Sequence, residues 1–414
     1  MIDVLIIGGG ASGLASAVAA KKENPHARIC ILEQKDMIGK KILSTGNGRC
    51  NFTNEKMGPE FFYSDHPENV DRVIKKFGTE DTLSFFRGLG IVPKEKNGYY
   101  YPRSEQATAI LNVFKLFIKS SEIEVHTGTR VESIRKTKKG FLIETSEGKL
   151  EGRCIILALG GKASKVLGSD GSGYDLAKSF GHSMIPVVPA LVQLRTKKHP
   201  LLKASGVRAE ATVSIFSDEK FLAKDTGELQ ITAYGISGIP VFQVSRHAAK
   251  ALYYKKDVAA ELDFFPSMSE EELFDFYKKR RKEHNAYCAA DFLVGIFNQK
   301  LIPCLLRGAK IREDVKVSEL TDENLLMLSR TCKHTKLIVE DTNGFDNAQV
   351  CAGGICLKEI NPDTMESLFC EGLYLTGELL DVDGICGGYN LQWAWASGVL
   401  AGIAAGKRIN RRQV

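Results

Sequence analysis

Residues 2–13 read Ile2-Asp3-Val4-Leu5-Ile6-Ile7-Gly8-Gly9-Gly10-Ala11-Ser12-Gly13, and this stretch decides the fold. The apolar run is typical of a buried parallel strand, and the glycines follow it in the spacing G-x-G-x-x-G. The Ala-rich segment Leu14–Lys22 predicts a helix directly after them. Gly8 would permit a tight turn, Gly10 would let the backbone approach a pyrophosphate, and Gly13 would let the helix pack on the strand. The stretch therefore predicts the phosphate-binding turn of a dinucleotide site.

A second apolar run strengthens this interpretation. Arg28–Leu32 predicts the next strand, and Glu33 follows it, 20 residues after Gly13. A carboxylate at this distance accepts hydrogen bonds from a ribose diol, while the helix start offers free N–H groups to the phosphates. A glycine-rich turn of an unrelated α/β unit is the alternative, and the order of the elements disfavours it. The cofactor contacts expected here are Gly8, Gly10, Ala11, Ser12, Gly13, Glu33, Gln34 and Lys35.

The segment Gly39–Asn54 is dense in residues that tolerate left-handed backbone and that offer hydrogen bonds. Such a loop can wrap a polar ligand, with Lys41 and Arg49 facing a phosphate or a flavin carbonyl; a plain solvent-exposed loop is the alternative. Cys50 has no neighbouring thiol in the sequence, so we interpret it as a packing or backbone residue. The contacts expected in this loop are Lys41, Ser44, Gly46, Asn47, Gly48, Arg49, Cys50 and Asn51.

Later glycine-rich segments distinguish FAD from NAD, which the first turn does not. Glu122–Arg135 and Arg153–Leu159 predict strands, and the second runs into a glycine pair that is either a cofactor approach or a simple chain reversal. Near the other end of the chain, Gly372–Glu378 predicts a strand and Trp393–Ala405 a helix, with glycines between them. A helix N-terminus can stabilise negative charge on a reduced flavin, and Glu378 can hold ribityl or ribose hydroxyls. This second cofactor segment suits the long FAD molecule. The contacts expected are Val131, Gly160, Gly161, Gly377, Glu378, Gly387, Gly388, Tyr389, Asn390 and Leu391.

Composition limits the remaining classes. The chain has 414 residues, more than the roughly 250–300 at which a single core stops growing, so we expect more than one domain. It is 43% hydrophobic and 26% charged, which excludes a disordered or collagen-like chain. The formal charge of +6 is small, and we interpret the basic tail as a solvated terminus; it comprises Lys407, Arg408, Arg411 and Arg412. The ten cysteines form no C-x-x-C pair, which favours reduced thiols over a disulfide framework or a zinc site. With no signal peptide and no apolar run long enough to span a membrane, a cytoplasmic location is expected.

In this order, the segments resemble the BaiN-like, or YhiN-like, family of FAD-dependent oxidoreductases. The resemblance spans essentially the whole chain and rests mainly on GKKILSTGNGRCNFTN (39–54) and GLYLTGELLDVDGICGGYNLQWAWASGVLAG (372–402). The segments NAQVCAGGI (347–355) and ITAYGISGIP (231–240) also match. The chain departs at Ala233, where many relatives have histidine, and at Leu368, where many have lysine. Both departures weigh against substrate chemistry at these two positions.

The resemblance implies an α/β fold: a discontinuous GR2-type Rossmann-like FAD-binding domain with an inserted β-barrel and helical subdomain. We expect residues 1–188 and 346–414 to form the FAD-binding domain and 189–345 the substrate domain, its helical part at about 255–320. The residues agree: Val207–Ile215 alternates apolar and polar side chains, as a half-exposed antiparallel strand does. Ser269–Leu306 predicts helices, with a capping box at Ser269 and Glu272, and Ser318–Thr331 predicts another helix.

The resemblance also implies the chemistry. We expect FAD as the cofactor and NAD(P)H as a transient electron donor, because Gly171–Tyr174 is too short for a second nucleotide fingerprint. The favoured reaction is reduction of a C=C bond conjugated with a ketone, as in bile-acid enone reductases. An amine oxidase that uses O2, similar to aminoacetone oxidases, is the alternative, and a flavin-binding RNA-modifying protein is a third possibility that the modest charge disfavours. The partner expected is a small-molecule substrate, with no nucleic acid and no membrane.

The proton donor is not fixed by the sequence, and no metal site is expected. The Tyr99–Arg103 segment would line a substrate mouth or, as we favour, form an aromatic strand that packs on the core. Histidines at 66, 182 and 247 are interpreted as surface or hydrogen-bonded residues. Four side chains near the family motifs are candidate proton donors: Tyr174, Tyr234, Tyr389 and Arg103.

Overall fold

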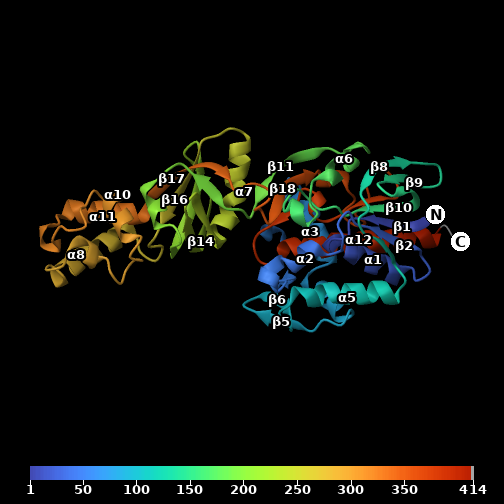
Figure 1. Ribbon diagram of the computed structural model, residues 1–414, viewed down its shortest axis with the longest axis horizontal. Coiled ribbons are helices and arrows are strands. Elements are labelled where there is room, and N and C mark those ends of the chain that lie inside the picture. The colour runs from blue at the N-terminus through green and yellow to red at the C-terminus, as the bar shows by residue number, and fades with distance from the viewer. Residues whose placement is uncertain (412–414) are drawn as a thin grey trace. The chain divides into compact units, whose positions relative to one another are not determined.

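The computed structural model describes residues 1–411, so Arg412 of the basic tail lies outside the described part. The chain divides into two compact units, one formed by Met1–Val187 with Val350–Val414 and the other by Val188–Gln349. Figure 1 shows the blue and red ends of the chain together in the first unit and the yellow and orange segments in the second. Within residues 1–411, no helix is both long enough and apolar enough to cross a bilayer.

A seven-stranded sheet forms the centre of the first unit, in the order β7-β2-β1-β10-β9-β8, with β19 also paired to β10. Its strands are β1 (Ile2–Ile7), β2 (Ile29–Leu32), β7 (Glu124–His126), β8 (Val131–Lys136), β9 (Phe141–Thr145), β10 (Gly148–Leu157) and β19 (Leu373–Leu375). Strands β7, β2, β1, β10 and β19 pair in parallel, and β9 and β8 add an antiparallel hairpin. The buried apolar runs predicted as strands therefore occupy the centre, because only residues covered on both faces can be apolar throughout.

Shorter elements surround this sheet. The helices are α1 (Ala11–Glu23), α2 (Lys40–Leu43), α3 (Pro67–Lys76), α4 (Thr79–Arg87), α5 (Ala107–Ser120), α6 (Ser172–Lys178) and α12 (Tyr389–Arg411). The remaining strands are β3 (Thr53–Asn54), β4 (Phe62–Tyr63), β5 (Pro93–Lys96), β6 (Tyr99–Pro102), β11 (Met184–Ala190), β18 (Val350–Ile355) and β20 (Asp383–Gly384). In particular, β6 pairs with β3 and β5, so the aromatic strand predicted at Tyr99–Arg103 is confirmed.

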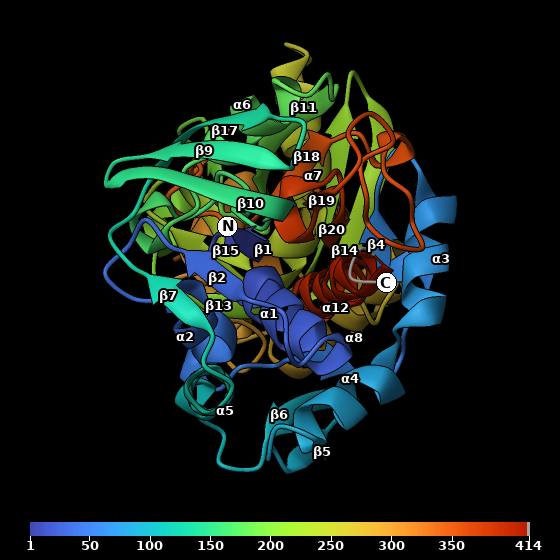
Figure 2. The same ribbon diagram turned by 90° about the vertical axis from the view of Figure 1, so that its right-hand side faces the viewer.

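Helices α1 and α12, from opposite ends of the chain, lie side by side (Figure 2). A row of glycines on α12 allows this contact. A Cβ atom on Gly398 would lie 2.4 Å from the Ser12 carbonyl oxygen, and one on Gly402 would lie 2.3 Å from the Ser16 carbonyl oxygen. No side chain fits at such distances, because both neighbours are backbone atoms of the facing helix. The packing of the two helices thus joins the two ends of the chain in one domain.

We expect Gly402→Val to destabilise the protein by about 1–3 kcal/mol, the usual effect of forcing extra atoms into a packed contact. The new Cβ would meet backbone, which can move only if the helices separate. Chemical denaturation monitored by circular dichroism measures the loss. Lys407→Ala, on an exposed position of the same helix, is the control and should leave the midpoint unchanged. A Gly402→Val midpoint equal to that of the wild type would show that the contact is not tight.

The second unit contains a closed antiparallel barrel in the order β12-β15-β14-β13-β16-β17. Its strands are β12 (Leu194–Thr196), β13 (Arg208–Ser217), β14 (Lys220–Thr232), β15 (Gly235–Gly238), β16 (Val258–Asp263) and β17 (Thr335–Thr342). The alternation predicted at Val207–Ile215 is confirmed, because β13 buries every second residue over most of its length. Helices complete the unit: α7 (Ile239–Tyr253), α8 (Glu270–Glu283), α9 (Ala289–Phe292), α10 (Ile302–Gly308) and α11 (Asp322–Lys333). The capping box at Ser269 and Glu272 is present at the start of α8.

Three predicted elements differ from the structure. The single strand expected over Glu122–Arg135 is wrong: β7 and β8 are separate strands, because Gly128 turns the chain with a φ of 70°. The strand expected at Arg153–Leu159 begins earlier and ends at Leu157, since its first half pairs with β9. The helical part of the second unit begins later than expected, because Val258–Asp263 is a barrel strand, and it continues through α11.

Candidate functional site

The turn between β1 and α1 forms an open cradle lined by backbone. Gly8 has a φ of 106°, and a Cβ there would lie 2.3 Å from the Ala158 carbonyl oxygen. A Cβ on Gly13 would lie 2.0 Å from the Gly8 carbonyl oxygen, so the helix packs directly on the turn. By contrast, within residues 1–411 a Cβ on Gly10 would meet nothing within 4 Å, and no side chain caps α1. The first-turn N–H groups of α1 therefore face a space that a phosphate can enter.

Glu33 lies beside this turn, at the end of β2. Its Oε2 accepts a hydrogen bond from the Gly9 amide at 2.9 Å, and its Oε1 accepts one from the Lys35 amide at 2.8 Å. Burial raises the pKa of the Glu33 carboxyl above its usual range, although these N–H groups oppose the shift. The neighbouring Gln34 side chain donates to the Gly168 carbonyl oxygen at 2.6 Å. The carboxylate is thus fixed next to the glycine turn, as a group that binds a ribose must be.

The loop after Glu33 takes the left-handed backbone that its composition predicts. Asn47, Gly48 and Cys50 have φ values of 54°, 81° and 56°. Cys50 is buried, and burial raises the pKa of its thiol to about 12, which agrees with a packing role. Arg49 lies over the Tyr101 ring, with 5.5 Å between the guanidinium carbon and the ring centroid. Exposed positions on this loop, available to a ligand, are Ser44, Gly46, Asn47, Gly48 and Arg49.

An ion pair joins this loop to the C-terminal part of the chain. Lys41 Nζ lies 2.8 Å from Glu378 Oε2 and 3.3 Å from the Ala163 carbonyl oxygen. Glu378 Oε1 accepts a hydrogen bond from the Cys351 amide at 2.8 Å. Two segments that the sequence predicted to contact one cofactor therefore meet through Lys41 and Glu378, 337 residues apart in the chain.

Gly161 and Tyr174 complete the surroundings of Glu378. A Cβ on Gly161 would lie 3.0 Å from Glu378 Oε1, 3.1 Å from the Tyr174 hydroxyl and 3.2 Å from Cys351 Sγ. The Tyr174 hydroxyl is buried and has no hydrogen-bond partner among the described residues. Burial raises the pKa of this phenol far above its usual range, so it holds its proton at neutral pH. A buried hydroxyl without a partner is unfavourable, which indicates that a ligand group completes its hydrogen bonding.

The segment between β19 and α12 packs against the start of α1 through Gly377. Gly377 has a φ of 67°, and a Cβ there would lie 2.7 Å from Ser12 Oγ. Its amide donates to Ser397 Oγ at 2.9 Å, and its carbonyl oxygen accepts from the Trp393 indole at 3.0 Å. The start of α1 and the turn after β19 are thereby held together.

The start of α12 is fixed from both sides. The Asn390 side chain pairs with both the amide and the carbonyl oxygen of Gly384, each at 2.8 Å. A Cβ on Gly388 would lie 3.0 Å from Asn51 Oδ1, a buried atom with no partner among residues 1–411. Gly387 accepts a hydrogen bond from the Asn54 side chain at 3.0 Å. This second orphaned polar atom again fits a site that a polar ligand completes.

The other predicted residues lie in different surroundings. Tyr389 packs on Phe61, with 4.9 Å between the ring centroids, and burial raises its pKa to about 12. Tyr234 belongs to the second unit, where Arg195 lies over its ring at 5.4 Å. Arg103 is exposed after β6, and Val131 is buried at the start of β8. Tyr234 therefore belongs to a different unit from Tyr174, Tyr389 and Arg103.

Sequence reasoning missed two residues that shape the site. Cys351 contributes its amide to Glu378, and its sulfur accepts a hydrogen bond from the Lys162 amide at 3.1 Å. Gln392 is buried; its Oε1 accepts from the Thr53 and Thr82 hydroxyls at 2.6 and 2.8 Å. A glutamine among the apolar residues of a helix was the signal available for Gln392. For Cys351 the sequence offered no signal beyond its place in a family motif.

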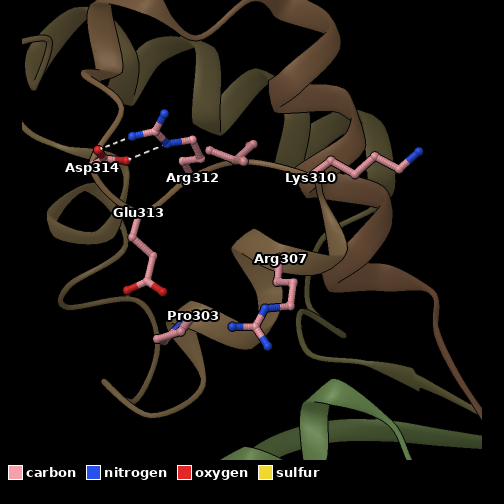
Figure 3. A pocket seen from close by; sticks show the side chains of 7 residues that line it. Pro303, Arg307, Lys310, Arg312, Glu313 and Asp314 are labelled. Carbon is pink, nitrogen blue, oxygen red and sulfur yellow. Dashed lines mark hydrogen bonds and ion pairs between the residues drawn. The ribbon is translucent and has the colours of Figure 1, made fainter.

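A cavity of about 400 Å³ lies in the second unit, and none of the predicted site residues lines it (Figure 3). Arg307 and Lys310 line it without an ion-pair partner among residues 1–411, while Arg312 is paired with Asp314 at 2.5 Å. Glu313 also lines the cavity. The lining therefore carries charges of both signs.

The fold agrees with what is known of similar proteins. The sequence profile described as HI0933-like protein Rossmann domain matches residues 2–404. A 3-dehydro-bile acid delta(4,6)-reductase from Clostridium scindens is 53% identical over 403 residues, which are 97% of this chain and 98% of that protein. A ribosomal RNA dihydrouridine synthase from Haemophilus influenzae is 28% identical over 417 residues, 98% of each chain. A solved quinol-fumarate reductase with menaquinol molecules shares the fold, with a TM-score of 0.52 at 14% identity over 99% of this chain and 71% of that one.

Proposed function

The chain belongs to the HI0933-like family of FAD-dependent oxidoreductases, as its motifs predicted, and we propose that it reduces a C=C bond conjugated with a ketone in a 3-oxo steroid or bile-acid-like substrate. The observation that carries this proposal is the 53% identity to the Clostridium scindens bile acid reductase across 97% of the chain. No insertion or truncation of domain size separates the two proteins, since 98% of that reductase is also covered.

The two relatives, by their names, support one type of reaction. One acts on delta(4,6) double bonds of a 3-dehydro bile acid, and the other makes dihydrouridine in ribosomal RNA. Both products arise when a C=C bond conjugated with a carbonyl group is saturated. Reduction of such a bond adds a hydride to one carbon and a proton to the carbon beside the carbonyl. The higher identity favours the steroid substrate over RNA.

The residues of the first unit fit FAD. The cradle at Gly10 is open, α1 is uncapped, and two buried polar atoms of the site, the Tyr174 hydroxyl and Asn51 Oδ1, have no partner in the described chain. In our proposal, the first turn of α1 binds the pyrophosphate and Glu33 binds the adenosine ribose. Lys41 and Glu378 would orient the ribityl or flavin end. When bound, FAD supplies the hydride chemistry.

The protein itself must supply binding, orientation and a proton. Of the four candidates, we propose Tyr174 as the donor, because its hydroxyl is protonated and uncommitted. Tyr389 is less suited because its ring packs between Phe61 and Phe62. The second unit is proposed to shape the substrate pocket. NAD(P)H is proposed as the electron donor that visits the first unit without a nucleotide-binding domain of its own.

We expect Glu33→Gln to weaken FAD binding about tenfold at neutral pH, since a hydrogen bond to a charged group contributes about 1.5 kcal/mol or more. The variant keeps the shape of the side chain and removes the charge. Wild-type affinity should also fall as the pH drops through the raised pKa of Glu33, whereas the variant should lack this dependence. The fluorescence of released flavin, followed from pH 8 to about pH 4, measures both the FAD affinity at neutral pH and its dependence on pH. Identical pH profiles would contradict the ribose role.

Anaerobic mixing distinguishes the candidate reactions. The purified, flavin-containing protein is mixed with NADH, NADPH or aminoacetone, and flavin absorbance is recorded. Bleaching by a nicotinamide supports the reductase, and bleaching only by the amine would overturn it in favour of the oxidase. Reduced protein is then offered a 3-oxo-4-ene steroid or an unmodified ribosomal RNA fragment. Reoxidation by the RNA alone would replace the steroid with a nucleic-acid substrate.

A further inference from the structure

A cluster of three metal-binding side chains lies at the edge of the central sheet, where β7 runs beside β2 (Figure 2). Cys30 on β2 is opposite Glu124 on β7, and Leu32 is opposite His126. Glu124 and His126 point to the same face, because they are two residues apart on one strand. The thiol sulfur, a carboxylate oxygen and an imidazole nitrogen of these residues all lie within 4.8 Å of one another.

We propose that Cys30, Glu124 and His126 form a binding site for a zinc-type divalent cation. A thiolate, an imidazole and a carboxylate are the ligand types that zinc takes, and three protein ligands leave a fourth position for water. Binding forms a metal–sulfur bond and releases the thiol proton to solvent, so no electron changes hands. The cysteine spacing gave no indication of this site, because its ligands come from strands more than 90 residues apart.

The charges around the cluster define how the ion would bind. Arg28 Nε lies 2.6 Å from Glu124 Oε1, which leaves Oε2, 3.8 Å from His126 Nε2, for the metal. The Asp3 carboxylate accepts a hydrogen bond from the Arg28 amide at 2.9 Å, and its charge is offset by Arg153, whose Nε lies 3.3 Å from Asp3 Oδ1. The guanidinium of Arg28 opposes a cation, so it competes with the metal for Glu124. Removing this positive charge should therefore strengthen binding, an effect opposite to that of removing a ligand.

The cluster also touches the backbone that carries Glu33. The Glu33 amide donates to the His126 carbonyl oxygen at 2.8 Å, and the Thr129 amide donates to the Glu33 carbonyl oxygen at 3.0 Å. An ion bound to Cys30 and to Glu124 and His126 would join β2 to β7, next to the backbone hydrogen bonds that hold Glu33. Zinc should thus raise the unfolding temperature, because a ligand that binds only the folded state stabilises it.

The test uses the purified, flavin-containing full chain, freed of metal with a chelator and dialysed against zinc chloride. Metal analysis should find one zinc ion per chain. Cobalt, used in a second titration, should give the red-region d–d absorption of a tetrahedral site, where oxidised flavin does not absorb. Cys30→Ser, Glu124→Gln and His126→Asn should each lower zinc affinity by at least the roughly 10- to 100-fold that loss of an outer-shell partner costs.

Two further variants make the test specific. His66→Asn is the control, because His66 and Glu68 form a similar imidazole–carboxylate pair, 3.3 Å apart, outside the cluster, and this variant should bind zinc as the wild type does. Arg28→Gln should bind zinc more tightly than the wild type. No stoichiometric zinc uptake by the wild type would overturn the proposal. So would unchanged affinity in Glu124→Gln and His126→Asn. Both side chains are partly exposed, and a retained flavin spectrum shows that each variant is folded.

Discussion

Gly10→Val is expected to produce a folded protein that purifies without flavin. A side chain at this position meets no atom of the described residues within 4 Å of its Cβ, and the φ of −81° is allowed for valine. The new methyl groups would instead enter the space into which the first-turn N–H groups of α1 point. Contacts of this kind cost about 1–3 kcal/mol and sometimes more, so FAD affinity should fall roughly 100-fold.

Reconstitution with FAD, followed by fluorescence quenching, measures this affinity, and circular dichroism measures the fold. Gly227→Ala in the barrel is the matched control: its Cβ would meet Pro240 at 3.4 Å, an ordinary contact, so both fold and flavin should be retained. Wild-type affinity in Gly10→Val would mean that the pyrophosphate does not lie at this turn. An unfolded Gly10→Val would contradict the open space found there.

Tyr174→Phe is expected to reduce turnover by about 100-fold, the lower end of what a positioned proton donor contributes. The same change should leave stability unchanged or slightly higher, because it removes a buried hydroxyl that lacks a partner in residues 1–411. Flavin content should also be retained. Loss of activity without loss of stability or cofactor would distinguish proton donation from packing.

Steady-state kinetics with NAD(P)H and an enone substrate measure the first effect, and thermal unfolding measures the second. Tyr277→Phe provides the control, since this tyrosine is also buried but belongs to the second unit, with its hydroxyl 3.5 Å from Cys332 Sγ. Full activity in Tyr174→Phe would exclude it as the donor. The proton would then have to come from another of the predicted candidates.

The sequence was sufficient for the parts of the site that depend on local backbone. The turn at Gly8 and the acid at Glu33 follow from a strand, a fingerprint and a spacing, and β1, α1 and β2 are where these patterns predict them. The left-handed backbone at Asn47 and Gly48 follows from loop composition in the same way, whereas the positive φ of Cys50 was not predicted. Local rules work here because each of these positions is determined by its own neighbours in the chain.

Contacts between segments far apart in the chain were harder to predict from the sequence. Lys41 and Glu378 were both expected near the cofactor, but nothing in the sequence indicated that they pair with each other. The amide of Cys351 and the buried Gln392 were missed, because their roles depend on which segments meet in the folded unit. The single strand predicted over Glu122–Arg135 was wrong for a local reason. Gly128 turns the chain and divides a segment whose side chains alternate as in one strand.

The reduced protein should pass a hydride equivalent to a conjugated C=C bond. The most direct measurement is a single turnover under anaerobic conditions, in which the chemically reduced holoprotein is mixed with a 3-oxo-4,6-diene bile acid. We expect flavin absorbance to return and one equivalent of a product with one fewer C=C bond to form for each flavin. Flavin that stays reduced with this substrate, yet is reoxidised rapidly by O2, would contradict this expectation.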